Sequence, residues 1–250
     1  MNLDGAVAIV TGAARGIGAA SARALSARGV QVVALDLESD ELLTAAKELG
    51  AMAISADVRD PAHADDVVAR TLDAFGRLDL VVANAGIGHY GEFGEMPAER
   101  IVDLVAVNVR APMLLARSAV APMLEQRRGA LVFISSIVGA LPVPREAVYG
   151  ATKAAVDAFA DTVREELRGS GVTASTVCPT VVDTLFFRDR GEPYDRSFPR
   201  PINPERIARA VVSAAEHGKA RYVVPRWMSL PMRLRGVAPA TYRAISRPFS

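Results

Sequence analysis

Two residues with complementary acid–base chemistry stand four positions apart in this sequence. Tyr149 and Lys153 belong to the run YGATK, which opens a predicted helix. Positions i and i+4 lie on one face of a helix, so the phenol and the ammonium point the same way. A free tyrosine has a pKa of about 10, too high for acid–base work at neutral pH. A neighbouring ammonium lowers that pKa, so the spacing predicts a tyrosine that transfers protons.

A pair of serines precedes this tyrosine and ends a predicted apolar strand. Ser135 and Ser136 follow the run ALVFI at Ala130–Ile134. A serine hydroxyl at that strand end is placed to hold a substrate carbonyl oxygen beside Tyr149. A tyrosine and a lysine at this spacing are common by themselves, and the serine-ended strand is what gives the pair a chemical context.

A glycine-rich turn stands near the N-terminus, between a predicted strand and a predicted helix. The run TGAARGIG at Thr11–Gly18 follows the apolar strand Ala6–Val10. Glycines allow a tight turn and a close approach of phosphates, and the helix N-terminus offers N–H groups to a pyrophosphate. Glycines also simply make turns, but the strand–turn–helix context favours a dinucleotide site. We predict that this site is formed by Gly12, Arg15, Gly16, Ile17 and Gly18.

The residue that ends the second predicted strand bears on the choice of cofactor. Asp36 is placed to accept hydrogen bonds from the adenosine ribose hydroxyls, and its charge repels a 2′-phosphate. Arg15 is the counter-argument, because a cation in the glycine-rich turn can pair with that phosphate. We predict NAD, with NADP as the less favoured cofactor. The structural alternative is that Asp36 caps the turn that follows it.

Two further strand ends carry candidate cofactor contacts. Asp57 is a candidate partner for the adenine amino group, with Val58 beside it, although an aspartate that leads into a helix is an equal reading. Asn84, Ala85 and Gly86 end the fourth predicted strand, where small residues leave room for a ligand. The Asn84 side chain has a purely structural alternative, which is to tie neighbouring strand ends together.

The elements that position these residues alternate between apolar strands and helical patterns. Strands that are apolar throughout belong in a parallel sheet covered on both faces, and strand–helix alternation winds such a sheet twice. We predict an α/β Rossmann fold in one domain, residues 1–225, with about seven mostly parallel strands. The predicted strands are Ala6–Val10, Gln31–Asp36, Met52–Ala56, Leu78–Ala83, Ala130–Ile134, Thr173–Cys178 and Arg221–Val224. The predicted helices are Gly16–Arg28, Asp40–Leu49, Pro61–Phe75, Ala98–Gln126, Tyr149–Arg168 and Pro204–His217.

Composition sets broad limits on function and setting. Lys and Arg number 29 against 28 Asp and Glu, a near balance that disfavours nucleic-acid binding. Cys178 is the single cysteine, which suits a reducing, cytoplasmic setting. The scattered histidines suggest no metal site. We see no signal peptide and no uninterrupted apolar run of about 20 residues, so we expect a soluble protein that at most contacts a membrane surface.

The C-terminal tail, residues 226–250, is basic and interrupted by prolines. From His217 onward the chain has no acidic residue. One interpretation is a segment that packs on its own subunit or a partner subunit. A second is peripheral membrane contact, because Trp227, Leu230 and Leu234 alternate with arginines, although the prolines oppose a long amphipathic helix. A third is a lid over the pocket.

Taken together, the motifs resemble those of the short-chain dehydrogenase/reductase family, from about Asp4 to Val224. The resemblance is carried by TGAARGIG, the run NAG at Asn84–Gly86, Asn108, the run ISS at Ile134–Ser136, and YGATK. It implies that Tyr149 is the general acid or base, and that Lys153 lowers its pKa and binds the nicotinamide ribose. It also implies that Ser136 orients the substrate oxygen. Asn108 would hold a water in a proton relay, with a helix-bend role as its structural alternative.

One segment departs from the family pattern. Where the family has Pro-Gly after the sixth strand, this chain has Pro179 and Thr180. A β-branched residue does not readily take positive φ, and it adds bulk near the expected nicotinamide. We expect Thr180 to reshape the pocket without abolishing cofactor binding. Val182 and Thr184 still match the family residues that hold the carboxamide.

These observations predict an NAD(P)-dependent oxidoreductase that interconverts a secondary alcohol and a ketone or aldehyde. Aliphatic and aromatic residues in the expected substrate loops suggest an apolar substrate, whether steroid-, retinoid-, terpenoid- or acyl-like; they are Val138, Leu141, Val143, Phe186 and Phe187. The alternative is a non-catalytic NAD-binding sensor or scaffold. Epimerisation or dehydration would need a further acid or base, for which Glu146 is the nearby candidate, although we expect it to be solvent-exposed. The resemblance also implies a homodimer or homotetramer.

Overall fold

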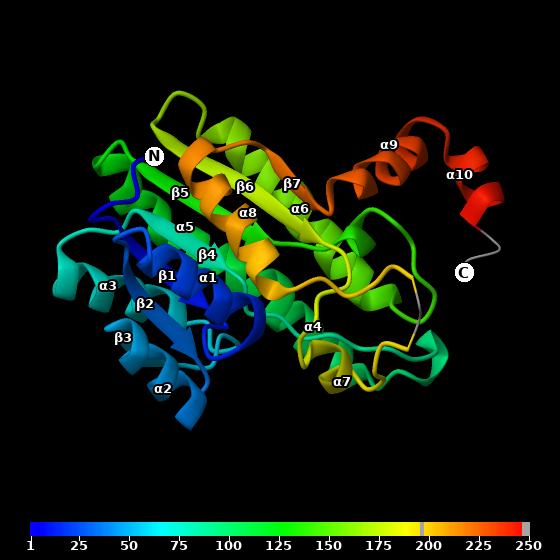
Figure 1. The fold of residues 1–250 in the computed structure, drawn as a ribbon, viewed down its shortest axis with the longest axis horizontal. Helices are drawn as coiled ribbons and strands as arrows, with labels where there is room; N and C mark the ends of the chain where they lie inside the picture. The colour runs from blue at the N-terminus through cyan, green and yellow to red at the C-terminus, as the bar shows by residue number, and fades with distance from the viewer. Residues whose placement is uncertain (196–197, 247–250) are drawn as a thin grey trace.

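The computed structural model describes residues 1–195 and 198–246. Seven strands form one sheet in the order β3-β2-β1-β4-β5-β6-β7 (Figure 1). Every pair of neighbouring strands is parallel, which confirms the predicted doubly wound architecture. The strands are β1 Val7–Thr11, β2 Gln31–Asp36, β3 Met52–Ser55, β4 Leu80–Ala83, β5 Gly129–Ile134, β6 Val172–Pro179 and β7 Arg221–Val224.

Helices cover both faces of this sheet (Figure 1). On one face, α1, α2 and α8 pack over a core that includes Leu25, Leu42 and Ile207. On the other face, α3, α5 and α6 enclose a second core. The helices of these two layers are α1 Gly16–Ser26, α2 Asp40–Leu49, α3 His63–Phe75, α5 Ala111–Glu125, α6 Ala147–Glu166 and α8 Pro204–His217.

The uniformly apolar strands follow from this two-sided burial. Along β1, Ala8 and Val10 belong to one core, whereas Ile9 belongs to the other. Side chains alternate between the faces of a strand, so both faces need apolar residues. The strand order reverses between β1 and β4, and in such sheets ligands bind outside the carboxyl ends of the strands at this point.

Most element boundaries lie within two residues of the prediction, so that α6, for example, begins at Ala147 and not at Tyr149, and two further differences have a visible cause. Helix α3 begins at His63 and not at Pro61, because the chain first makes a turn in which the His63 N–H donates to the Asp60 carbonyl. The predicted helix Ala98–Gln126 is α4 Ala98–Val105, a π-helical segment at Ala106–Arg110, and α5. The widened turn falls on Asn108, in line with the tendency of π-bulges to mark functional sites.

The stretch Ala98–Glu125 is, by length and composition alone, the one helix among the described residues able to cross a membrane. It contains no uninterrupted apolar run of that length, because charged residues such as Asp103 and Arg110 lie within it. The stretch packs against α3 and α6 and against strands β4 and β5. We therefore assign it to the protein core.

Two regions outside the sheet complete the described chain. The chain between β6 and α8 contains the short helix α7, Phe186–Asp189. After β7 the tail forms a 3-10 turn, Arg226–Met228, followed by α9, Ser229–Val237, and α10, Pro239–Ser246. In Figure 1 these last helices extend away from the sheet, and the break between them falls at Ala238, just before Pro239. The residues from 247 onward lie outside the described residues.

Candidate active site

One large cavity, with a volume of about 980 Å³, opens at the carboxyl ends of the strands. It brings together most of the predicted site residues, although they come from seven separate segments of the chain. The predicted residues that line it are Gly12, Arg15, Gly16, Ile17, Asp36, Asp57, Val58, Asn84, Ala85, Gly86, Ser136, Tyr149, Lys153, Pro179, Val182 and Thr184. Gly18 and Asn108 lie behind the wall.

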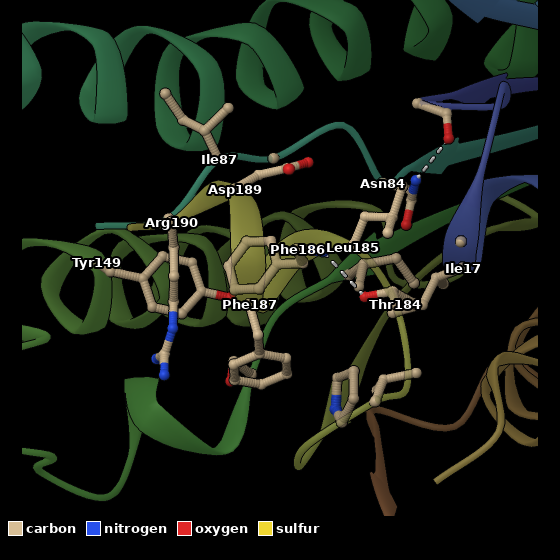
Figure 2. Close-up of a pocket in the computed structure, with 18 of the residues that line it drawn as sticks. Ile17, Asn84, Ile87, Tyr149, Thr184, Leu185, Phe186, Phe187, Asp189 and Arg190 are labelled. Carbon is tan, nitrogen blue, oxygen red and sulfur yellow. Dashed lines mark hydrogen bonds between the residues drawn. The ribbon is translucent and has the colours of Figure 1, made fainter. Parts of the chain in front are cut away.

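Tyr149 lines this cavity from the first turn of α6 (Figure 2). Burial raises the pKa of its phenol above the ordinary value, and a hydrogen bond with the Ser136 hydroxyl works in the opposite direction. Ser136 is itself fixed at the end of β5, where its hydroxyl accepts a hydrogen bond of 3.4 Å from the Val138 N–H. The predicted serine and tyrosine are therefore in contact.

Lys153 lies one turn further along α6 and is buried. Its ammonium is 5.7 Å from the centre of the Tyr149 ring and donates a 2.9 Å hydrogen bond to the Ile134 carbonyl at the end of β5. Burial lowers the pKa of Lys153 to about 8, because an ammonium removed from water loses its hydration. The lysine thus stands beside the phenol, with a pKa close to physiological pH.

Asn108 stands behind this pair, and its side chain is fully engaged. Its Oδ1 accepts from the Ile87 N–H at 2.9 Å, and its Nδ2 donates to the Ile87 carbonyl at 2.9 Å and to the Thr152 hydroxyl at 3.1 Å. These contacts support the structural alternative for the side chain, which ties the π-helical segment to the loop after β4. The proton-relay role of Asn108 stays a prediction.

The glycine-rich turn is packed so closely that it requires glycine at two positions. Gly12 adopts a φ of 66°, and a Cβ there would lie 2.7 Å from the Asn84 Nδ2. A Cβ on Gly18 would overlap the Gly12 carbonyl. Asn84 holds the turn through its Nδ2, which donates to the Thr11 carbonyl at 2.9 Å. The structural role considered for Asn84 is therefore present in the structure, and its cofactor contact stays a prediction.

The two aspartates at the adenosine end are held differently. The Asp36 carboxylate accepts the Ala14 N–H at 2.9 Å and the Leu37 N–H at 2.8 Å, which fixes it at the rim of the glycine-rich turn. Asp57 is held by Arg59, whose guanidinium hydrogen bonds lower the pKa of that carboxyl. Asp57 does not lead directly into α3, and its adenine contact stays a prediction.

Arg15 and Thr184 connect the glycine-rich turn to the segment after β6. The guanidinium of Arg15 pairs with the Asp189 carboxylate on α7 at 2.6 Å. A Cβ on Gly16 would lie 3.2 Å from the Thr184 methyl, so the two segments approach each other closely. In this arrangement the charge of Arg15 is already matched by a carboxylate.

Thr180 lines the cavity wall and is buried. Within the described chain, positive φ at residues other than glycine occurs only at Arg127 and Arg145, so Thr180 carries no such strain. Its N–H donates to the Val224 carbonyl at 2.9 Å, whereas its buried hydroxyl has no hydrogen-bond partner among the described residues. The threonine is accommodated by the backbone and adds side-chain bulk to the wall.

Aromatic residues of α7 close the cavity over the tyrosine (Figure 2). The Phe186 ring lies 5.4 Å from the Tyr149 ring, and Phe187 contacts both Phe186 and Tyr194. Val138, Val143, Phe186 and Phe187 line the cavity, as predicted. Leu141, also predicted, is buried but is not part of the cavity lining.

The prediction that Glu146 is exposed to solvent is wrong. Glu146 is only 8% exposed, because its carboxylate pairs with the equally buried Arg190, which follows α7. The Arg190 guanidinium also lies over the rings of Tyr90 and Phe187, at 4.4 and 4.5 Å. Sequence reasoning missed this pair because its members are 44 positions apart and belong to no motif.

Sequence comparison places these features in a known class. The family described as short chain dehydrogenase matches residues 6–195. An uncharacterized oxidoreductase of Thermotoga maritima is 34% identical over 220 residues, which cover 85% of this chain and 83% of the relative. The 3-oxoacyl-[acyl-carrier-protein] reductase of Escherichia coli is 33% identical over 195 residues, with 74% and 76% of the two chains covered.

Solved structures agree with the sequence comparison. A short-chain dehydrogenase/reductase from Burkholderia phymatum, in complex with NAD, superposes with a TM-score of 0.86 at 26% identity and covers 94% of each chain. An alcohol dehydrogenase from the archaeon Thermococcus sibiricus, complexed with 5-hydroxy-NADP, superposes with a TM-score of 0.77 at 27% identity and covers 87% of this chain and 95% of that one.

The fold and the site define a Rossmann-type oxidoreductase with a tyrosine, a serine and a lysine in the wall of its cavity. More specifically, this chain belongs to the short-chain dehydrogenase/reductase family. Its structural relatives bind nicotinamide dinucleotides, some in the NAD form and some in the NADP form.

Proposed function

We propose that this protein interconverts a secondary alcohol and the corresponding ketone or aldehyde, with NAD as the preferred cofactor and an apolar substrate. The observation that carries the proposal is the contact of Tyr149 with Ser136 beside a buried Lys153, inside one cavity that also contains the glycine-rich turn. A non-catalytic NAD sensor has no evident need for this arrangement of acid–base groups.

The cavity suits a dinucleotide at the glycine-rich end. A Cβ at Gly12 or Gly18 would meet the backbone or the Asn84 amide, so the turn packs as tightly as a phosphate-binding turn must. Gly12, Gly16 and Ile17 would hold the pyrophosphate, and Val182 and Thr184 the carboxamide. When bound, the nicotinamide supplies or accepts the hydride.

The residues of the chain supply orientation and proton transfer. Ser136 holds the substrate oxygen beside the phenol, and Tyr149 takes the hydroxyl proton in oxidation or gives it back in reduction. Burial raises the pKa of Tyr149, so an adjacent ammonium is needed to make the phenolate accessible. Lys153 supplies this charge from one turn further along the same helix.

Asp36 supports the preference for NAD. Its carboxylate is fixed by two backbone N–H groups at the end of β2, where it would face the ribose hydroxyls and repel a 2′-phosphate. Arg15, the residue that argues for NADP, forms an ion pair with Asp189. A guanidinium in that pair is less available to a phosphate.

The test is turnover of a panel of apolar secondary alcohols with NAD⁺ or NADP⁺, followed by the absorbance of the reduced cofactor. We expect activity with NAD⁺ that falls by about 10²–10⁴-fold in Tyr149→Phe, the usual range for general acid–base catalysis. Asp36→Ser should raise activity with NADP⁺ relative to NAD⁺. Tight NAD⁺ binding without turnover on a broad panel would favour the sensor function.

We also propose that the protein works in the cytoplasm as a homo-oligomer. Support for the homo-oligomer comes from exposed apolar side chains on the long helices, namely Val102 and Val105 on α4 and Leu124 on α5. A second copy of this chain would cover them. Light scattering coupled to gel filtration tests this, since a monomer at micromolar concentration would contradict it.

A further inference from the structure

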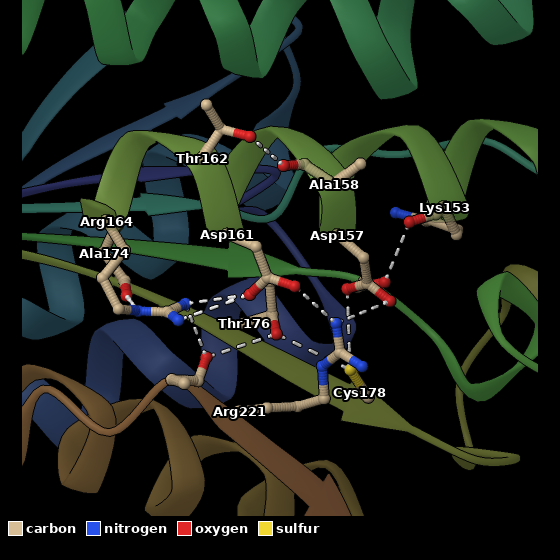
Figure 3. Close-up of polar contacts among 12 residues, drawn as sticks. Lys153, Asp157, Ala158, Asp161, Thr162, Arg164, Ala174, Thr176, Cys178 and Arg221 are labelled. Atoms are coloured by element: carbon tan, nitrogen blue, oxygen red, sulfur yellow. Dashed lines mark hydrogen bonds and ion pairs between the residues drawn. The ribbon is translucent and has the colours of Figure 1, made fainter. Parts of the chain in front are cut away.

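A buried carboxylate that the proposed mechanism does not use lies directly behind the catalytic lysine. Asp157 follows Lys153 by one turn of α6 and is only 7% exposed (Figure 3). Burial of a carboxylate is costly unless other groups compensate for it. The contacts of Asp157 therefore indicate which groups compensate for the cost of burying its carboxylate.

Polar groups from three neighbouring strands or strand ends surround this carboxylate. The Ser135 hydroxyl, just after β5, lies beside it and donates to the Lys153 carbonyl at 3.2 Å, and the Cys178 thiol on β6 lies 3.8 Å from its Oδ1. Arg221 reaches across from β7, and its Nη2 lies 3.7 Å from the Asp157 Oδ2 (Figure 3). The same guanidinium pairs with the more exposed Asp161 at 3.2 Å.

Lys153 and Asp157 form no direct ion pair in the described structure, because the Lys153 ammonium donates instead to the Ile134 carbonyl at 2.9 Å. The two charges interact electrostatically through space, and this interaction is strong where water is excluded. Polar groups surround Lys153 from every adjoining element. They are Tyr149 and Asp157 on α6, Asn108 on the π-helical segment, Ser135 just after β5, Cys178 on β6 and Arg221 on β7.

The charges of this group oppose the effect of burial on the lysine. Burial lowers the pKa of Lys153, and Asp157 is the carboxylate that works to raise it again. Burial also raises the pKa of Asp157, and the charge of Arg221 counteracts this effect. The Cys178 thiol contributes no charge near neutral pH, because burial raises its pKa.

We propose that Asp157, held by Arg221, is a positioning residue whose negative charge keeps Lys153 protonated at neutral pH. The negative charge of Asp157 is present whether or not a substrate is bound. Its consequence for catalysis rests on the proposed function, because an uncharged lysine would no longer assist the Tyr149 phenolate.

The lysine content of this chain allows a direct measurement. Lys47, Lys153 and Lys219 are its lysines, and the first and last are exposed. In protein labelled with [ε-¹³C]lysine, NMR titration therefore follows three signals, which Lys47→Arg and Lys219→Arg assign. In the wild type we expect the signal of Lys153 to titrate near pH 8.

The decisive comparison is between Asp157→Asn and Asp161→Asn. Removing the buried charge should lower the pH at which Lys153 titrates by about one unit or more, since that is the usual effect of a close charge. Asp161 contacts the same arginine, but its side chain is 52% exposed, so its removal should leave Lys153 nearly unchanged. Asp157→Glu, which retains the charge, should restore most of the shift.

Identical Lys153 titrations in wild type and Asp157→Asn would overturn the proposal, as would an equal shift in Asp161→Asn. If Asp157→Asn does not fold, the smaller neutral variant Asp157→Ser provides the same comparison. In an active enzyme, the acid limb of kcat/KM for alcohol oxidation should also move to higher pH in Asp157→Asn. A shifted NMR titration without any turnover would uphold the role of Asp157 while the proposed function failed.

Discussion

The rings of Phe186 and Tyr149 are in contact in the cavity, with centroids 5.4 Å apart and an interplanar angle of 47°. Phe186 belongs to α7 and packs against Gly88, where a Cβ would lie 2.6 Å from its ring. The phenol is thereby covered by a side chain from a segment remote in sequence. A substrate that reaches Tyr149 must pass this ring or pack against it.

The first prediction concerns this contact. Phe186→Ala should reduce kcat/KM for apolar alcohols by about 10–100-fold, mainly through KM, because burial of a phenylalanine side chain contributes about 1.5–3 kcal/mol. The dissociation constant for NAD⁺ should change little. Steady-state kinetics and cofactor fluorescence measure the two quantities.

A second phenylalanine of the same segment provides the control. Phe198 is exposed and stacks on Trp227, away from the tyrosine. Phe198→Ala should leave kcat/KM within a few-fold of the wild type. Equal losses in both variants would mean that the Phe186–Tyr149 contact has no special part in substrate binding.

The second prediction concerns the buried ion pair between Glu146 and Arg190. Glu146→Gln removes the counter-charge of a buried guanidinium, and such changes usually cost about 3–5 kcal/mol of unfolding free energy. The exposed Arg145–Glu192 pair, 3.3 Å long, supplies a matched control. Glu192→Gln should cost less than about 1 kcal/mol. Urea denaturation compares the two, and a similar small loss in both would show that the buried pair is not needed for stability.

Much of the fold could be predicted because each strand carries its own signal. A strand such as β1, apolar on both faces, has few placements other than the interior of a parallel sheet. The active-site motifs are equally local, because the glycine-rich turn and the Tyr149–Lys153 pair each lie within one short segment. For that reason the cavity lining contains most of the predicted residues.

The features that were missed depend on contacts between distant segments. Arg190 joins Glu146 only once α7 has folded over the start of α6, and no periodicity records that contact. Asp157 did have a signal, because it lies four positions after Lys153 just as Lys153 lies four after Tyr149. The same helical spacing, extended by one turn, would have identified it.

The third prediction tests the threonine that replaces the usual glycine. Thr180 lines the cavity, and its hydroxyl has no partner among the described residues, so Thr180→Gly removes bulk without breaking a side-chain hydrogen bond. We expect the ratio of kcat/KM for bulkier over smaller ketones to rise by about tenfold, the usual scale for small changes in pocket size. Thr180→Ala should give an intermediate ratio. If Thr180→Gly altered neither substrate preference nor cofactor affinity, this residue would have no role in shaping the pocket.

The fourth prediction concerns the tail, where apolar side chains form a stripe along α9. Leu230, Leu234 and Val237 are exposed at spacings of four and three, which places them on one helical face, and Trp227 precedes them. Arg226 and Arg233 are exposed nearby, and no acidic residue follows His217. An apolar face flanked by cations is typical of segments that bind anionic membrane surfaces, and we propose such a surface as its partner.

Sedimentation with vesicles tests this partner. We expect the full chain to bind phosphatidylglycerol vesicles more strongly than phosphatidylcholine vesicles, and added salt to weaken that binding because it screens the charges. The double variant Leu230→Gln, Val237→Gln should lose most of the bound fraction. Leu185→Gln, which changes an exposed leucine beside α7, should retain it. Equal sedimentation of the wild type and the double variant would exclude the membrane, and loss of a dimer in the double variant would instead assign the stripe to a second copy of this chain.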